Sequence, residues 1–367
     1  MNILLVIAIL ALLIIVHELG HFIAAKISRV RVQEFGVGYP PTALSLGRIG
    51  ETELTLNWIP FGGFVRLFGD AGENERGPGS FMAANRGKQI LILFAGVAMN
   101  MLFGWLLFTG SFMIGIPRPV DASSDIAAAQ VQGSQLFIAD VVQGSPAESA
   151  GIKPGDELVG VVDDKGIAPR SLSPAGVREF VSERGGKELL ISYIRNGATS
   201  TTGVIPANAV IPGQSDRAGV GVDLVLITST PLSLVDAAVF AYKTSINAFL
   251  AVGQNLWTII KQAFTGSLNL RGIVGPVGLV SVVGDASSAG IAQILALAAF
   301  ISINLAVINL VPIPLLDGGR ILIVAIESVI RRRTPKLAVH LLNTVGIVMI
   351  GLLMVVVTYH DIARLVT

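Results

Sequence analysis

NILLVIAILALLIIVHELGHFIAAKIS, residues 2–28, is an apolar run whose second half carries the motif His17-Glu18-Leu19-Gly20-His21. A helix over residues 1–27 would be about 40 Å long and would cross a hydrocarbon core of about 30 Å. Two histidines at i and i+4 share one face of a helix, where both imidazoles can bind one zinc ion beside the glutamate. No basic residue precedes the apolar run, which argues against a cleaved signal peptide. The run therefore predicts a transmembrane helix that carries chemistry.

The composition of the chain supports the same interpretation. Hydrophobic residues make up 52% of the 367 positions and charged residues 14%, whereas soluble chains carry about 25% charged residues. Each ionisable group at mid-membrane costs about 2.5–3.5 kcal/mol, so a glutamate between two histidines there indicates a functional site. The chain has no cysteine, so a transition-metal site must use His, Asp or Glu. The net charge of +1 gives no sign of a nucleic-acid partner.

Apolar stretches and basic clusters predict a polytopic α-helical membrane protein with about four transmembrane helices. Lys26 and Arg29 follow the first helix, so its C-terminal end is expected on the cytoplasmic side and the N-terminus outside. The second helix follows Arg86 and runs outward, and the fourth runs outward from the basic cluster at residues 331–336. The third helix must then run inward.

One apolar stretch, residues 232–264, carries several polar side chains and fits either a fifth span or an amphipathic or re-entrant segment. A fifth span would reverse the third helix, so the peripheral interpretation is preferred. The predicted segments are a first transmembrane helix with the HExxH motif (1–29), a cytoplasmic-side, membrane-associated β-loop (30–87), a second transmembrane helix (88–117), an extracytoplasmic region (118–229) with a small α+β domain at about 130–203, the peripheral segment (230–289), a third transmembrane helix with the sequence Asn-x-x-Pro-x-Pro-x-Leu-Asp-Gly-Gly (290–319), a basic cytoplasmic segment (320–336) and a fourth transmembrane helix (337–360).

A catalytic zinc site needs a third protein ligand and one open position. Asp317 is the strongest candidate, because two prolines break the third helix just before it and two glycines follow, which lets the backbone turn sharply. Irregular backbone at membrane depth is tolerated where it is buried in protein. His17 lies about 24 Å from the outer end of its helix, and Asp317 reaches the same depth if the third helix runs inward. His340 and His360, both on the fourth helix, are the alternatives.

These two motifs, each at its proper helix, resemble the site-2 protease family of intramembrane metalloproteases, and the order of segments resembles its bacterial RseP-type branch. The resemblance covers essentially the whole chain. It implies that the Zn²⁺ ligands are His17, His21 and Asp317. It also implies that Glu18 is the catalytic general base and that Asn309 helps to hold an unwound substrate segment.

Two further stretches carry the resemblance. The apolar stretch with Gly62, Gly63 and Phe64 resembles the membrane-associated β-loop of the family, which is thought to bind the substrate as an added strand. Such pairing has a physical reason, because the backbone of an unwound transmembrane helix needs hydrogen-bond partners. Gly96 and Asn100 match the small-residue and asparagine signature of the second helix, for which close helix packing is the expected role.

Residues 135–196 resemble a PDZ domain in the bacterial permuted arrangement, on the stretch from Ser145 to Asp156. One such domain is expected here, whereas the best-known members carry two in tandem. The resemblance implies single-pass transmembrane substrates, such as anti-sigma factors or remnant signal peptides. It also implies a multi-pass protein of the bacterial cell (inner) membrane, with the N-terminus and the PDZ domain outside the cytoplasm.

Two other functions are alternatives to the protease. A non-catalytic, membrane-anchored PDZ scaffold predicts no metal and no effect of Glu18→Gln on substrate levels. A metal-ion transporter would need a through-path of intramembrane acids, but Asp236 and Glu327 are the only obvious extras and form no series. Both leave the complete ligand set and its neighbouring base unexplained.

Overall fold

The fold is that of a computed structural model, which describes residues 2–70, 77–120, 133–208, 217–265, 275–332 and 334–366. The chain forms two compact units. The first consists of Met1–Ile114 and Leu232–Thr367, and the second, Gly115–Pro231, is inserted into it. The insertion agrees with the predicted soluble domain between the second and third apolar segments.

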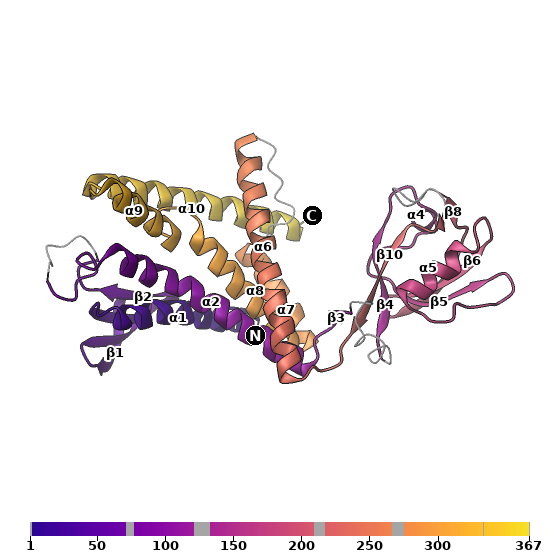
Figure 1. The fold of residues 1–367 in the computed structure, drawn as a ribbon, viewed down its shortest axis with the longest axis horizontal. Helices are drawn as coiled ribbons and strands as arrows, with labels where there is room; N and C mark the ends of the chain where they lie inside the picture. Colours follow the sequence, from indigo (N-terminus) through magenta and orange to yellow (C-terminus); the bar gives the residue numbers. More distant parts are fainter. Residues whose placement is uncertain are drawn as a thin grey trace. The chain divides into compact units, whose positions relative to one another are not determined.

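The first unit is a bundle of helices with a β-hairpin (Figure 1). Its elements are α1 (Asn2–Ile27), β1 (Val32–Ile49), β2 (Thr52–Leu67), α2 (Arg86–Ile114), α6 (Leu234–Thr265), α7 (Pro276–Ala289), α8 (Ile291–Leu310), α9 (Asp317–Ile330) and α10 (Lys336–Val366). Among the described residues, four helices are long and apolar enough to cross a membrane: α1, α2, α8 and residues Leu234–Gln262 of α6. The side chains of α10 are described only in part, and they include the shorter apolar stretch Val339–Val348, so a fourth span at residues 337–360 stays a prediction.

Helices α1, α2 and α8 alternate in direction. His21, near the end of α1, lies beside Ile92 near the start of α2. Ser111, near the end of α2, donates a hydrogen bond to the carbonyl of Ala292 at the start of α8 (2.8 Å). Ser302, further along α8, donates to the carbonyl of Asn100 (2.8 Å). Helix α8 therefore runs antiparallel to α2 and parallel to α1, which is the relative direction predicted for the third apolar segment.

The core of the bundle lies where these three helices meet. Leu13, Ile92 and Ile303 come from α1, α2 and α8, and each is 0% exposed. A side chain at Gly104 of α2 would bring its Cβ within 3.0 Å of Ile303. Small residues of this kind let helix backbones approach closely, which is the main source of helix association in a membrane.

Helix α6 covers the segment at residues 232–264, whose peripheral position stays a prediction. It is one continuous helix of 32 residues. The indole N–H of Trp105 in α2 donates to the carbonyl of Ala238 (2.9 Å), and the rings of Phe112 and Phe240 meet edge to face at 4.8 Å. Because the N–H of Leu232, just before α6, donates to the carbonyl of Phe112 near the end of α2 (3.1 Å), α6 starts at the end of α2 and runs antiparallel to it, in the same direction as α8.

Helix α7 explains how α6 and α8 can share a direction. Gly284, in its second half, lies against Asn2 at the start of α1, and Val283 is buried beside Val6 and Ile9. Helix α7 therefore runs back toward the end of the bundle where α8 begins. Because α7 returns along the bundle, α6 and α8 can run in one direction.

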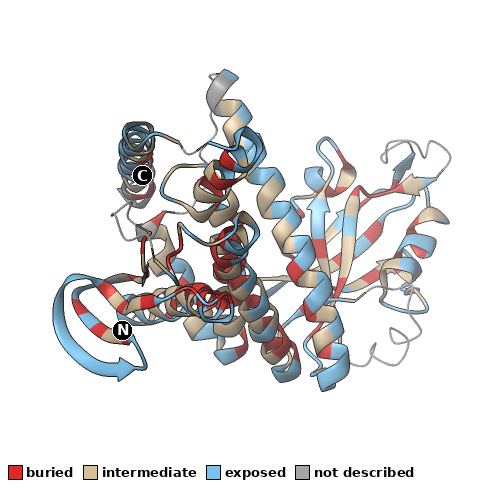
Figure 2. Cartoon of the chain, turned by 60° about the vertical axis from the view of Figure 1, so that its left-hand side comes forward, coloured by how far each residue is buried: buried red, intermediate tan, exposed pale blue. Residues whose placement is uncertain are grey.

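Strands β1 and β2 pair antiparallel in a two-stranded sheet, as the sequence predicted for this region. At the base of the hairpin, Val32 and Leu67 are buried against α1 and α2. The outer part exposes large apolar side chains, among them Trp58 at 72% and Ile49 at 61% (pale blue in Figure 2). An exposed apolar patch of this kind marks an interaction site, and membrane association of the hairpin stays a prediction.

The second unit is a small α+β domain. Its elements are β3 (Arg118–Pro119), β4 (Gln135–Val141), α4 (Pro146–Ser149), β5 (Glu157–Asp163), α5 (Pro174–Ser182), β6 (Leu189–Arg195), β7 (Ala198–Val204), β8 (Ala207–Asn208), β9 (Ala218–Gly219) and β10 (Val222–Thr228). Six strands form one antiparallel sheet in the order β3-β10-β4-β5-β6-β7. Side chains from the sheet and from α4 and α5 share one buried cluster.

This unit extends further along the chain than the predicted limit near residue 203. Strand β10 lies inside the sheet, and its Leu226 is buried in the same cluster as Leu136 and Leu189. The prediction stopped too early because β10 pairs with strands far away in the sequence, a partnership that no local pattern reveals. Residues 130–132, at the predicted start, lie outside the described part of the chain.

Candidate metal centre

Helix α1 presents two histidines on one face. His17 and His21 are buried at 9% and 8% exposure, and their rings meet edge to face with centroids 4.8 Å apart. Their Nε2 atoms are 3.1 Å apart. The i, i+4 spacing of the sequence therefore places the Nε2 atoms of the two rings side by side.

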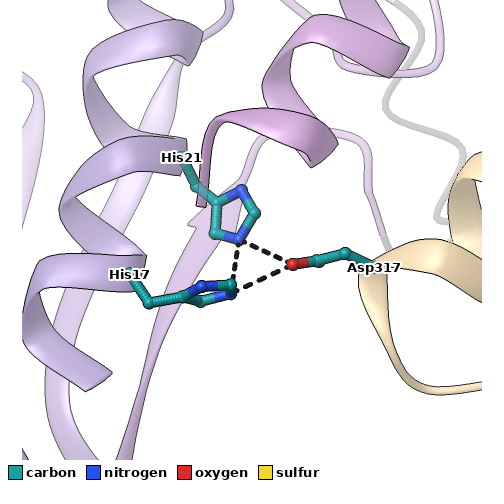
Figure 3. A group of neighbouring side chains, drawn as sticks. All are labelled: His17, His21 and Asp317. Carbon is teal, nitrogen blue, oxygen red and sulfur yellow. Dashed lines mark hydrogen bonds and ion pairs between the residues drawn. The ribbon is translucent and has the colours of Figure 1, made fainter. Parts of the chain in front are cut away.

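Asp317, the first residue of α9, completes the group (Figure 3). Its Oδ2 lies 3.0 Å from Nε2 of His17 and 3.2 Å from Nε2 of His21. One candidate ligand atom from each of the three residues lies within 4.8 Å of the others. The structure thus brings together residues about 300 positions apart in sequence, and their role as metal ligands stays a proposal.

The backbone before Asp317 explains how it reaches the histidines. Helix α8 ends at Leu310, and Leu315 adopts a left-handed conformation (φ 83°) just before α9 begins. A Cβ on Gly318 would collide with the carbonyl of Leu310, and one on Gly319 would lie 2.6 Å from the carbonyl carbon of Ile313. The two glycines were expected to form the turn. They instead lie in the helix and let its first turn pack against the preceding backbone.

The donor set fits a zinc ion. His21 points Nδ1 at the carbonyl oxygen of Ile92 (2.8 Å), which can only accept, so the neutral ring carries its proton on Nδ1. The bare Nε2 then faces a buried carboxylate oxygen of Asp317 at 3.2 Å. Lone pairs this close repel each other unless a cation lies between them. Two imidazoles and a carboxylate bind zinc with bonds of about 2.0–2.2 Å, so their donor atoms lie roughly 3.3 Å apart, close to the distances found here.

Gly96 of α2 lies directly against this centre. A Cβ at this position would lie 2.5 Å from Nε2 of His21 and 2.7 Å from Cε1 of His17. The sequence suggested helix packing as the role of Gly96, and the structure adds that the missing side chain makes room for both imidazoles.

Glu18 is positioned by β2. Its carboxylate accepts a hydrogen bond from the backbone N–H of Val65, and a Cβ on Gly63 would lie 3.4 Å from Cγ of Glu18. Glu18 also lies close enough to His21, His17 and Asp317 for their charges to act on it, so its carboxylate lies between the candidate ligands and the hairpin. A carboxylate held beside a metal-bound water is the arrangement in which a general base works.

The three residues expected to bind substrate have different surroundings. Gly63 is buried beside Glu18, whereas the ring of Phe64 packs on Gly36 of β1. Gly62 (φ 97°) lies under the ring of Tyr39, where a Cβ would collide with it. Burial, followed by the negative charge of Glu18, raises the pKa of Tyr39, so its hydroxyl stays protonated near the site.

Asn309 lies at the end of α8, and its Nδ2 is 3.5 Å from Nε2 of His17. The amide therefore borders the candidate metal centre, as its predicted role requires. The alternative ligand His340 is exposed on α10, and the group brought together among the described residues does not include it. The backbone around His360 is helical, but its side chain lies outside the described set.

Sequence reasoning did not find three participants: the carbonyl of Ile92, the N–H of Val65 and Tyr39. The first two are backbone groups, which carry no residue-type signal. Tyr39 lies in β1, and only its pairing opposite Ile59 of β2 brings it to Gly62.

Comparison with protein-family models matches residues 5–353 to Peptidase family M50. The chain belongs to peptidase family M50. This is the site-2 protease family, so the resemblance noted in the two motifs is confirmed, and the chain is a peptidase of the metalloendopeptidase type. The membership argues against the scaffold and transporter alternatives.

Several curated proteins resemble this M50 member over nearly their full length. A protein of Clostridium perfringens named as a zinc metalloprotease is 33% identical over 95% of both chains. The zinc metalloprotease RasP of Shouchella clausii is 27% identical over 98% of both. A protein of Helicobacter pylori named as a zinc metalloprotease is 28% identical over 97% of both.

Among solved structures, the PDZ domain of an SdrC-like protein from Listeria monocytogenes matches 29% of this chain and 93% of its own. The identity is 15% and the TM-score 0.20.

Proposed function

We propose that this M50 peptidase is an intramembrane zinc metalloendopeptidase that hydrolyses peptide bonds in or near the transmembrane segment of single-pass membrane proteins. The observation that carries the proposal is the meeting of His17, His21 and Asp317 beside Glu18. It occurs among helices that are long and apolar enough to cross a membrane. Soluble metalloproteases use a similar donor set, but here the first two donors lie on such a helix.

In this proposal His17, His21 and Asp317 would hold the zinc ion. When bound, the ion supplies a Lewis acid that polarises the scissile carbonyl and acidifies water. Glu18 takes a proton from the attacking water and returns it to the leaving nitrogen. The hydrogen bond from Val65 keeps the Glu18 carboxylate in place for both transfers.

The hairpin and Asn309 are proposed to hold the substrate. Strand β2 passes beside Glu18 and pairs with a strand on one side only, so its other edge can receive an unwound substrate as an added strand around Gly62, Gly63 and Phe64. The amide of Asn309 lies 3.5 Å from Nε2 of His17 and can bind the substrate backbone there. Substrates of this kind are anti-sigma factors or remnant signal peptides already trimmed on the outer side of the membrane.

The test is cleavage of a tagged single-pass substrate in cells that express wild type or Glu18→Gln, with the zinc content of both purified proteins. Glu18→Gln keeps the shape of the side chain but removes the base, so we expect cleavage to fall by about 10²–10⁴-fold while zinc is retained. Glu183→Gln, an exposed position in the second unit, is the matched control and should cleave normally. Equal cleavage by wild type and Glu18→Gln, with no metal in either, would overturn the proposal.

A further inference from the structure

The two histidines of the candidate metal centre have different partners for their second ring nitrogens. Nδ1 of His21 lies 2.8 Å from the carbonyl oxygen of Ile92, a group that can only accept. Nδ1 of His17 lies 3.4 Å from the side-chain amide of Asn100, which can either donate or accept. A metal-binding histidine needs its second nitrogen protonated and hydrogen-bonded, because this sets the tautomer and the ring orientation. For His21 the backbone carbonyl always accepts from a protonated Nδ1. For His17 the protonation of Nδ1 depends on which amide atom Asn100 turns toward it.

The position of Asn100 is unusual in two respects. The residue is 0% exposed, and its Oδ1 has no hydrogen-bond partner among the described groups. Its Nδ2 faces Nδ1 of His17 in the present arrangement. Since a donor facing a nitrogen requires that nitrogen to be bare, this arrangement puts the proton of a neutral His17 on Nε2, the atom that points at Asp317.

That tautomer cannot bind a metal through Nε2. A rotation of the Asn100 amide by 180° about its last bond exchanges oxygen and nitrogen and leaves every other atom in place. Oδ1 then accepts a hydrogen bond from Nδ1–H of His17, and Nε2 is left with a free lone pair directed at Asp317. Either orientation leaves one amide atom without a described partner, so the number of hydrogen bonds does not select between them. Metal binding through Nε2 selects the second orientation, because it requires Nε2 to be unprotonated.

We propose that Asn100 is a positioning residue that accepts a hydrogen bond from Nδ1 of His17 and thereby directs its Nε2 toward the metal. The inference rests on the proposed metal site and extends it to a residue that the sequence marked only for helix packing. In this role Asn100 accepts from Nδ1 of His17 as the carbonyl of Ile92 accepts from Nδ1 of His21. Helix α2 then orients both histidines of α1, one through a side chain and one through its backbone.

The backbone of Asn100 is held independently of its side chain. The hydroxyl of Ser302 in α8 donates to the Asn100 carbonyl at 2.8 Å, and both residues are 0% exposed. The contact between α2 and α8 therefore does not need the amide. This separation makes the two roles of the position, packing and orientation of His17, distinguishable by substitution.

The experiment compares zinc affinity in the purified full-length protein, measured by competition with a chelating indicator. Asn100→Leu keeps the volume but offers no acceptor, and Asn100→Asp keeps an acceptor oxygen facing His17. We expect Asn100→Leu to weaken zinc binding by about 10–100-fold and Asn100→Asp to bind within a few-fold of wild type. The visible spectrum of Co²⁺ placed in the site should change in Asn100→Leu and be preserved in Asn100→Asp. Ser302→Ala, which loosens the same helix contact without touching His17, is the control and should bind zinc normally.

The outcomes separate this inference from the proposed function. Zinc binding by Asn100→Leu as tight as wild type, or equal losses in Asn100→Leu and Asn100→Asp with both proteins folded, would overturn the positioning role and leave the metal site intact. A wild-type protein that binds no zinc would overturn both. If Asn100→Leu fails to fold, Asn100→Ala takes its place. In that case a loss in Ala that is restored in Asp supports the inference, and normal binding by Ala overturns it.

Discussion

At the scale of single residues, the candidate metal centre depends on a glycine, which has no side chain to occupy the space of the two imidazoles. Gly96 lies against both imidazoles, and any larger residue must displace them. Helix propensity favours alanine over glycine by about 0.5–1 kcal/mol, so a glycine in the middle of α2 has a local cost. Glycine at position 96 leaves space for His17 and His21, which explains why this position of α2 is not alanine.

Gly96→Ala should therefore weaken the metal site although it improves the helix. We expect the added methyl group to push His21 away from Asp317 and to lower zinc affinity and cleavage by about tenfold or more. Gly253→Ala is the matched control, because a Cβ there meets nothing within 4 Å in α6. The measurement is zinc competition together with cleavage of the tagged substrate. Normal zinc affinity in Gly96→Ala would show that the centre can shift without loss.

At the scale of elements, α9 is the component that must be placed correctly, because its first residue is Asp317. Two ion pairs join it to its neighbours. Arg320 in its first turn pairs with Asp70 after β2, and Glu327 pairs with Arg86 at the start of α2 (2.7 Å). Glu327 is 7% exposed and also accepts the backbone N–H of Thr334. This glutamate, which the sequence left without a role, therefore holds α9 to α2.

Glu327→Ala should destabilise the first unit by about 3–5 kcal/mol, because it leaves the Arg86 guanidinium without its buried partner. The double variant Arg86→Met/Glu327→Leu should recover most of this loss, since no unpaired charge is left. Denaturant unfolding in detergent measures both. The exposed pair Arg48–Glu53 (3.8 Å) provides the comparison, and Glu53→Ala should cost about 1 kcal/mol or less. Equal costs for Glu327→Ala and Glu53→Ala would contradict the argument.

At the scale of the whole molecule, a helical unit carries the candidate metal centre, and a separate α+β unit is inserted in the chain between α2 and α6. Helices α1 and α8 share a direction, so residues 17 and 317 reach one level of the bundle from the same side. The basic residues around the ends of the helices favour a cytoplasmic position for the segment between α9 and α10. The second unit is then expected on the opposite side of the membrane.

Single-cysteine labelling tests this topology without background, because the chain has no cysteine of its own. Lys187→Cys is exposed in the second unit, and Pro335→Cys is exposed before α10. A maleimide that cannot cross the inner membrane should label Lys187→Cys in whole cells and Pro335→Cys only after lysis. The reverse pattern would place the metal centre nearer the outer face and would exclude the proposed orientation.

The sequence by itself determined the features that depend on local spacing. The HExxH motif places two histidines on one helix face, the apolar runs predicted α1, α2 and α8, and the sequence predicted a small α+β domain between the second and third apolar segments. It also favoured Asp317 as the third ligand, because two prolines break the third helix before it and two glycines follow, and an inward-running third helix would bring it to the depth of His17.

Only the tertiary structure decided the features that depend on contacts between distant segments. The carbonyl of Ile92 and the N–H of Val65 complete the centre, yet backbone groups are the same in every residue and leave no trace in a sequence. The packing of α6 on α2, the return through α7 and the place of β10 in its sheet were missed for a related reason. Local patterns specify which face of an element is apolar, whereas its neighbour is selected by the packing of the whole chain.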